Sequence, residues 1–145
     1  MCEFEFDESS LTSGFHEAME SRLELVDEQT ARIIERVRSL PCARQDLEEV
    51  SLALSEALAN AVIHGNREDP GKKVQICGAC ESQDQLVLVI TDEGDGFDPA
   101  AIPDPTLADN LFSNHGRGVF LIQRLMDQAE FRLGGRQIVL RKRIP

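Results

Sequence analysis

The chain has 145 residues, of which 41% are hydrophobic, and a formal net charge of −11. This length gives one globular domain with a substantial core, and the negative charge argues against direct nucleic-acid binding, which needs clustered Lys and Arg. No apolar stretch is long enough to cross a membrane, and the acidic start, MCEFEFDESS, is not a signal peptide. We therefore expect a cytoplasmic protein whose four cysteines are free thiols.

The spacing of apolar residues predicts the elements of the amino-terminal part. Residues 2–7 alternate apolar and acidic side chains, as in a short strand. Residues 11–19 carry apolar side chains at helical intervals, and residues 21–26 alternate again like a strand. A helix is expected over residues 28–39, ended by Pro41.

The middle of the chain has the clearest periodicity. Apolar residues recur at every third or fourth position over residues 46–64, which predicts a long amphipathic helix. A turn signal at residues 67–72 is followed by two strand-like runs, 73–82 and 85–91, close enough to form a hairpin.

The carboxyl-terminal part begins with residues 97–115, whose Pro, Asp and Asn content predicts a loop. Residues 118–129 form an amphipathic pattern, and the last segment reads as a hairpin turning at Gly134 and Gly135. Helices followed by antiparallel strands with a helix between them predict an α+β two-layer sandwich. It would have one mixed, mostly antiparallel sheet and helices on one face.

Cys77 and Cys80 form a C-x-x-C motif. A zinc or redox site is one interpretation, and two ordinary residues of a strand is the other. We favour the second, because tetrahedral zinc needs four ligands and no second pair stands at ligand spacing.

Three motifs do not follow from packing alone. Glu56, Asn60 and His64 stand at i, i+4 and i+8, so they form a polar stripe on the expected helix. A solvated helix face would also explain this stripe, although Asn is a poor helix former.

The other two motifs are rich in glycine. In DEGDGFD, Asp92 follows the strand-like run, and Gly94 and Gly96 allow the chain to bend closely. In HGRGVF, Gly116 and Gly118 precede a helix, whose free N–H groups and positive dipole end suit a phosphate. Each motif alone also fits an ordinary bend or helix start, but the three in this order are specific.

EALANAVIHGN, DEGDGFD and HGRGVFLI resemble the N, G1 and G2 boxes of the Bergerat-fold ATPases, which include gyrase, histidine kinases and mismatch-repair ATPases. In detail the chain is similar to the anti-sigma factor serine/threonine-protein kinases of bacteria. The similarity lies in E-A-L-x-N-A-V-x-H-G, the short lid PDPTLADNLF, and G-R-G-V-F-L-I followed by LMD. The resemblance implies a histidine-kinase-like ATPase domain over residues 21–145 and an amino-terminal extension over residues 1–20.

The resemblance implies a role for each motif. Asn60 would hold Mg²⁺ through its amide oxygen, and Glu56 would act as the general base on the incoming hydroxyl. Asp92 would accept a hydrogen bond from the adenine amino group, and His64 would belong to the nucleotide site.

The glycines would let the backbone come close to the nucleotide. Gly94 and Gly96 would let the chain close on the adenine. Gly116, Arg117 and Gly118 would cover the phosphates of ATP, with Arg117 adding a cation.

The function implied is that of an anti-sigma factor, acting as a homodimer. It would bind Mg-ATP, sequester a sigma factor and phosphorylate Ser or Thr of an anti-sigma factor antagonist. An ATP-binding regulatory module that sequesters its partner without phosphotransfer is the alternative, and the presence of Glu56 favours the kinase.

Two further observations bear on this choice. His16 and Glu17 suggest a histidine-kinase catalytic domain, but no dimerising helical hairpin fits before the helix that carries Asn60. Arg136 and Gln137 stand where members of the branch usually have a Thr that contacts the adenine side of the site.

Overall fold

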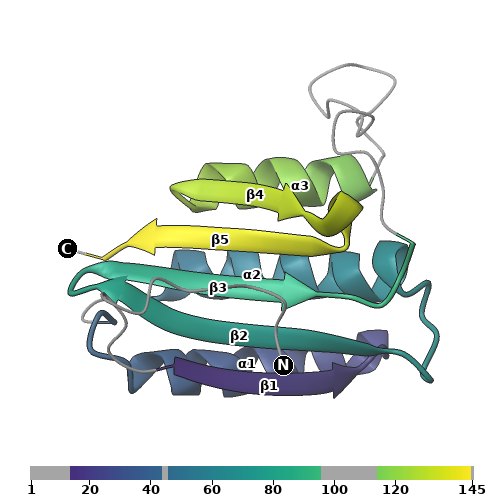
Figure 1. Cartoon of the computed structure of the whole chain (residues 1–145), viewed down its shortest axis with the longest axis horizontal. Helices are drawn as coiled ribbons and strands as arrows, with labels where there is room; N and C mark the ends of the chain where they lie inside the picture. The colour runs from purple at the N-terminus through teal and green to yellow at the C-terminus, as the bar shows by residue number, and fades with distance from the viewer. Residues whose placement is uncertain (1–13, 44–45, 96–113, 145) are drawn as a thin grey trace.

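The structure is a computed structural model that describes residues 14–43, 46–95 and 114–144, with the backbone alone for 114–117. Its strands form one sheet in the order β1-β2-β3-β5-β4, and every neighbouring pair is antiparallel (Figure 1). The strands are β1 (Gly14–Glu20), β2 (Lys73–Ser82), β3 (Gln85–Thr91), β4 (Gln128–Arg132) and β5 (Gln137–Arg143).

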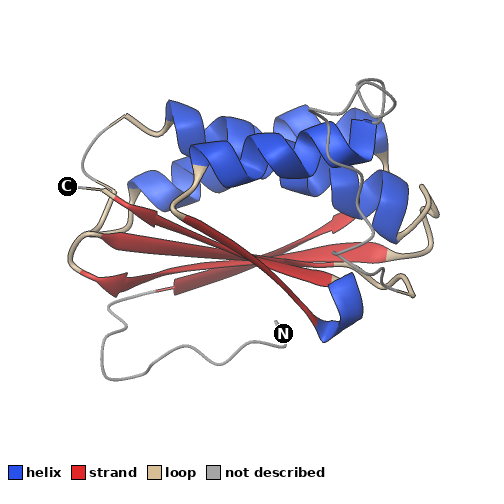
Figure 2. Ribbon diagram, turned by 90° about the horizontal axis from the view of Figure 1, so that it is seen from above, coloured by secondary structure: helices blue, strands red, loops and turns tan. Residues whose placement is uncertain are grey.

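Three α-helices cover one face of this sheet, as Figure 2 shows. They are α1 (Val26–Arg38), α2 (Glu48–Asn60) and α3 (Asn114–Leu125). Helix α2 lies in the middle, because it packs against both α1 and α3. The predicted α+β sandwich with helices on one face is therefore confirmed, and the described strands are all antiparallel.

The main core lies between the helices and the sheet. Leu54 and Leu58 of α2 are fully buried there, against apolar residues of the central strands such as Ile76, Leu88 and Leu140. Side chains alternate in direction along a strand, and the apolar residues of α2 have helical spacing, so these side chains meet in one layer.

The strongly periodic segments form the predicted elements. The helices expected over 28–39 and 46–64 correspond to α1 and α2, and the strands expected over 73–82 and 85–91 are β2 and β3. The last hairpin turns at Gly134 and Gly135, whose φ angles of 67° and 97° suit glycine.

The last helix has different ends from those predicted. Helix α3 begins at Asn114 and ends at Leu125, whereas a helix was expected over residues 118–129. Residues 128–132 are instead the strand β4, because they pair with β5.

Two assignments near the amino end are wrong. Residues 11–19 were expected to be helical, but residues 14–20 are the edge strand β1, which pairs with β2 along its whole length and buries Phe15 and Met19. Residues 21–26 were expected to be a strand, but they contain a 3₁₀ turn and the first residue of α1. Long-range pairing overrides local spacing here.

The predicted boundary after residue 20 does not coincide with the edge of the sheet, since β1 precedes it. The strand expected over residues 2–7 and nearly all of the loop expected over 97–115 lie outside the described residues. No helix in the described part of the chain is long and apolar enough to span a membrane.

The expectation of free thiols is also wrong. Cys42, after α1, forms a disulfide with Cys80 in β2, with a Cα–Cα distance of 5.9 Å. The described ranges contain no free cysteine. The two residues are 38 positions apart, and only the packing of the loop after α1 on the sheet brings them together.

The two cysteines of the C-x-x-C motif lie on opposite faces of the sheet. Cys80 belongs to the core under the helices, whereas Cys77 belongs to a cluster on the other face. A spacing of three residues in a strand produces this division, because side chains alternate between faces. Among the described residues, no group of His, Cys, Asp and Glu could hold a metal ion.

Candidate functional site

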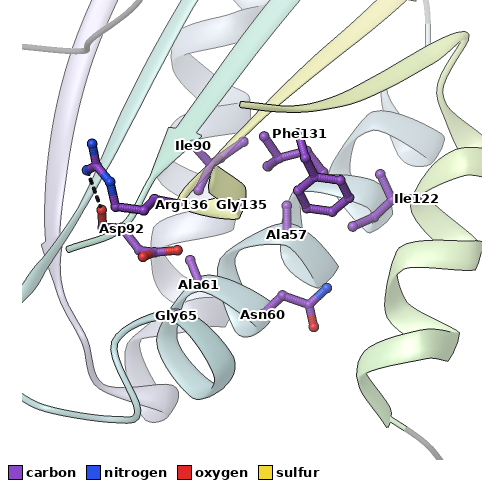
Figure 3. Close-up of a pocket in the computed structure, with 11 residues that line it drawn as sticks. Ala57, Asn60, Ala61, Gly65, Ile90, Asp92, Ile122, Phe131, Gly135 and Arg136 are labelled. Carbon is purple, nitrogen blue, oxygen red and sulfur yellow. Dashed lines mark hydrogen bonds between the residues drawn. The ribbon is translucent and has the colours of Figure 1, made fainter. Parts of the chain in front are cut away.

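A pocket opens between α2, the end of β3 and the turn before β5 (Figure 3). Its walls are mostly apolar, and its polar side chains are Asn60, Asp92 and Arg136. The remaining residues of the wall are Ala57, Ala61, Gly65, Ile90, Ile122, Phe131, Gly135 and Ile138. A cavity of this kind suits a flat, largely apolar ligand that presents a few polar atoms.

Asp92 is the buried acid of this pocket. It follows β3 directly and is 6% exposed, and its Oδ1 atom accepts a hydrogen bond from the N–H of Gly94 at 2.8 Å. Burial raises the pKa of Asp92, while the Gly94 N–H and the positive charges of Arg136 and Lys72 oppose that rise. A carboxylate in this position can accept a hydrogen bond from a donor group of a ligand.

Arg136 stands beside Asp92. Its Nη1 atom donates to the main-chain oxygen of Asp92 at 3.4 Å, and the N–H of Asp92 donates to the main-chain oxygen of Arg136 at 2.9 Å. The two residues therefore form one wall of the pocket (Figure 3).

Gly65 is a site residue that the sequence motifs did not single out. A Cβ atom on Gly65 would lie 2.2 Å from Oδ2 of Asp92, and one on Gly94 would lie 2.0 Å from the oxygen of Gly65. Glycine at both positions lets the turn after α2 approach the turn after β3. The glycine that ends IHG in the first motif was the available signal.

Asn66 was missed as well. It is buried, and its Oδ1 atom accepts a hydrogen bond from the N–H of Glu93 at 2.7 Å. Its Nδ2 atom donates to Ser21 Oγ and to the main-chain oxygen of Lys73. One side chain thus joins the turn that carries Asp92 to two other segments.

The chain leaves α2 through a π-helical turn, Ala61–Gly65, in which the N–H of Asn66 donates to the oxygen of Ala61 at 2.8 Å. The predicted stripe of Glu56, Asn60 and His64 assumes a regular helix, whereas this turn is wider. His64 is exposed and does not line the pocket. Partial burial of its ring lowers the pKa of His64.

Glu56 and Asn60 keep the expected spacing of one helical turn, and Gly118 of α3 lies against both. A Cβ atom on Gly118 would lie 3.0 Å from Oε2 of Glu56 and 3.1 Å from Nδ2 of Asn60. The absence of a side chain at Gly118 therefore lets α3 approach the polar stripe of α2.

The remaining predicted residues are partly described. Gly116 and Arg117 lie in the first turn of α3, close in sequence to Gly118. Gly96 lies outside the described residues. The structure thus brings the helix motif, the turn after β3 and the start of α3 to the same end of the sheet.

The sequence is similar to those of known proteins. Residues 19–142 match the family of histidine kinase-like ATPase domains. The serine-protein kinase RsbW of Bacillus subtilis (strain 168) is 34% identical over 90 residues, covering 57% of this chain and 55% of that protein.

Two further proteins with the same name are similar to a comparable degree. RsbW of Bacillus licheniformis is 34% identical over 98 residues, covering 61% of this chain and 58% of the relative. RsbW of Bacillus velezensis is 33% identical over 92 residues, covering 59% and 56%. The matched part therefore spans little more than half the length of these relatives.

Proposed function

Because the chain belongs to the family of histidine kinase-like ATPase domains, we propose that it binds ATP with Mg²⁺ and transfers the γ-phosphate to Ser or Thr of a protein. The observation that carries this proposal is the buried carboxylate of Asp92 in an apolar pocket beside Asn60. The similarity to proteins named serine-protein kinase RsbW supports the choice of acceptor.

The pocket suits adenine. Asp92 accepts a hydrogen bond from the exocyclic amino group, and Ile90, Ile122 and Phe131 contact the ring. Guanine presents a carbonyl oxygen at the corresponding position, so a carboxylate there disfavours it. The small side chain of Ala57 leaves room for the base beside α2.

The phosphates extend from the base toward Asn60 and the start of α3. Asn60 would hold Mg²⁺ through its amide oxygen, a hard ligand that suits this cation. When bound there, the metal would supply positive charge that offsets the charge of the phosphates. The backbone N–H groups in the first turn of α3, at Gly116 and Arg117, suit phosphate oxygens.

Glu56 is the proposed general base. It precedes Asn60 by one helical turn, and both side chains lie against Gly118. Glu56 takes the proton of the acceptor hydroxyl as that oxygen bonds to the γ-phosphorus and the bond to ADP breaks.

The proposed acceptor is an anti-sigma factor antagonist, and the sequestered partner is a sigma factor, in a cytoplasmic homodimer. The alternative is a nucleotide-binding module that sequesters its partner without transferring phosphate. The position of Glu56 beside Asn60 supports the kinase, because simple nucleotide binding needs no base at this place.

Incubation of the protein with γ-labelled ATP and its co-purified partners tests this proposal. We expect one small partner protein to acquire the label on Ser or Thr. Nucleotide binding without any labelled partner would instead support the module, and the absence of nucleotide binding would contradict both.

A further inference from the structure

The charged end of Arg136 lies behind Asp92. In Figure 3 the guanidinium points away from Asn60, whereas the carboxylate of Asp92 turns toward Ala61. The Nη1 atom of Arg136 donates to the main-chain oxygen of Asp92 at 3.4 Å. A positive charge therefore stands beside the buried acid, and this charge acts on a ligand through Asp92 rather than by contact.

An unusual turn before β5 places Arg136 in this position. Leu133, Gly134 and Gly135 have φ angles of 55°, 67° and 97°, so three residues in succession are left-handed. Glycine adopts such angles freely, whereas a leucine there is strained. Leu133 is also 37% exposed, so burial of its side chain does not account for the strain. The turn does bring the main-chain oxygen of Arg136 to the N–H of Asp92, at 2.9 Å, and backbone strain of this kind is concentrated at functional sites.

The environment of Asp92 disfavours a charge on its carboxylate. The residue is buried among mostly apolar walls, and this burial raises the pKa of Asp92. The positive charges of Arg136 and Lys72 oppose the rise, and the effect of Arg136 is the larger of the two. The other titratable groups next to Asp92 in its own turn and in the turn after α2 are exposed: His64, Glu93 and Asp95.

We propose that Arg136 is a positioning residue for nucleotide recognition, whose guanidinium keeps the Asp92 carboxylate charged and holds the main chain that carries it. The bond of 3.4 Å is longer than a usual N–H···O hydrogen bond, so the charge of Arg136 contributes more than the bond does. The nucleotide in this inference rests on the proposed function, whereas the effect of Arg136 on Asp92 requires no ligand.

Substitution at Arg136 can isolate this role. The residue has ordinary φ and ψ angles of −73° and −14°, and its bond to the N–H of Asp92 uses the main chain, so neither depends on the side chain. Arg136→Met keeps an unbranched stem in the pocket wall and removes the charge. Arg136→Gln is a second neutral variant, and Arg136→Lys keeps the charge.

Arg143→Gln is the matched control. It makes the same change of net charge on the same strand, and Arg143 is exposed. It stands at the far end of β5, seven residues from Arg136 and therefore about 24 Å away along the strand. At physiological ionic strength, interactions between exposed charges are largely screened over such a distance.

The titration of Asp92 in the protein without nucleotide tests the proposal directly. Carbon-detected NMR follows the side-chain carboxyl carbon of Asp92 against pH, and Asp92→Asn assigns the signal. We expect the midpoint to rise by about 0.5–1 pH unit in Arg136→Met and Arg136→Gln, because a neighbouring positive charge is lost. In Arg136→Lys and Arg143→Gln it should stay within about 0.3 unit of the wild type.

Two results would overturn the role of Arg136. One is a midpoint in the neutral variants equal to that in Arg143→Gln. The other is a loss of folding in all three variants at Arg136, because the side chain would then be structural. One folded neutral variant suffices for the titration, and loss of folding in both neutral variants but not in Arg136→Lys would itself show that the charge is required.

Nucleotide binding distinguishes positioning from direct contact. We expect Asp92 to be ionised near neutral pH in every variant, so the ATP affinity of Arg136→Met should lie within about threefold of that of Arg143→Gln. As the pH falls, Arg136→Met should lose affinity at a higher pH than Arg143→Gln, because its Asp92 is protonated earlier. The phosphates of ATP titrate equally in both titrations, so the comparison removes their contribution.

The same measurements separate this inference from the proposed function. An affinity loss of equal size at every pH in Arg136→Met would indicate direct contact or a structural role, and would overturn the inference. A wild type that binds no ATP at any pH would contradict the proposed function, while the titration of Asp92 would still decide whether Arg136 keeps the carboxylate charged.

Discussion

Gly65 lies directly against Asp92, and a Cβ atom on the glycine would lie 2.2 Å from Oδ2 of the acid. A distance this short means that the carboxylate rests on the backbone of the turn after α2. The position of the Asp92 carboxylate, the proposed acceptor for adenine, is therefore set by Gly65 from another element. The two residues are far apart in the sequence, so a local sequence pattern does not predict their contact.

Gly65→Ala should weaken ATP binding by about tenfold or more, because the added methyl group pushes the Asp92 carboxylate out of place. Gly71→Ala is the matched control, since Gly71 lies in the following turn and is exposed. Isothermal calorimetry of both variants measures the effect. Wild-type affinity in Gly65→Ala would show that the site adapts and that this contact does not position Asp92.

Asp92→Asn should weaken ATP binding by about 10- to 100-fold, which corresponds to the loss of a hydrogen bond to a charged group. Asp95→Asn is the control, because Asp95 lies in the same turn but is exposed. The same calorimetric titration is used for both. Equal ATP affinities for wild type and Asp92→Asn would remove Asp92 from the adenine site.

The affinity for ATP should also depend on pH through Asp92. Burial raises the pKa of this acid above its ordinary value of 3.8, so the carboxylate that accepts the adenine hydrogen bond is lost at a higher pH than for an exposed Asp. Affinity should fall as the pH falls through the raised pKa. The phosphates of ATP titrate as well, so the decline must be measured relative to Asp92→Asn.

The same pKa shift makes the stability of the fold depend on pH in the opposite direction to the ATP affinity. A raised folded-state pKa means that the folded protein holds the proton more tightly than the unfolded chain does. The contribution of Asp92 to stability is thus full below its ordinary pKa and is lost as the pH rises through the raised value. Urea unfolding measures the free energy of unfolding of the wild type and of Asp92→Asn at each pH. As the pH rises from the ordinary to the raised pKa of Asp92, the wild type should lose stability relative to the mutant. A constant difference would contradict the shift.

Glu56→Gln should lower phosphate transfer by about 10²- to 10⁴-fold, the usual contribution of a general base, while ATP affinity stays close to that of the wild type. Glu48→Gln, on the first turn of the same helix and exposed, is the control. Single-turnover transfer to a purified antagonist at saturating ATP gives the rates. Transfer by Glu56→Gln at the wild-type rate would exclude Glu56 as the base.

The Cys42–Cys80 disulfide should stabilise the fold measurably. It closes a loop of 38 residues, for which the loss of chain entropy in the unfolded state gives about 3–4 kcal/mol. Cys42→Ala/Cys80→Ala should lower the free energy of unfolding by roughly this amount under oxidising conditions. Under reducing conditions the variant and the wild type should differ much less. A similar difference in both conditions would assign the effect to packing.

The sequence predicted the parts of the fold whose pattern is local. Helix α2 and the β2–β3 hairpin follow from apolar periodicity, and the order of the three motifs indicated that Asn60 and Asp92 share a site. Strand β1 was not predicted, because its residues have helical spacing and become a strand only by pairing with β2. The Cys42–Cys80 bond was missed for a similar reason.

Within the site, the sequence did not predict the backbone geometry. The stripe of Glu56, Asn60 and His64 assumes a regular helix, whereas residues 61–65 form a π-helical turn. Gly65 and Asn66 act through contacts with the turn after β3. Their importance depends on distances between elements, which spacing along one element does not encode.

The π-helical turn Ala61–Gly65 has a consequence for changes in chain length. It contains one residue more than a regular turn needs, and this extra residue directs Gly65 and Asn66 toward the turn after β3. Deleting one residue from 61–65 would preserve a continuous helix but rotate Asn66 by about 100°, away from Glu93. Residues 67–71 of the next turn are exposed, and the N–H groups of Asp69 and Lys72 donate within that turn, to the oxygens of Asn66 and Asp69. Natural and engineered insertions should therefore accumulate after Asn66 and be excluded from the five residues before it.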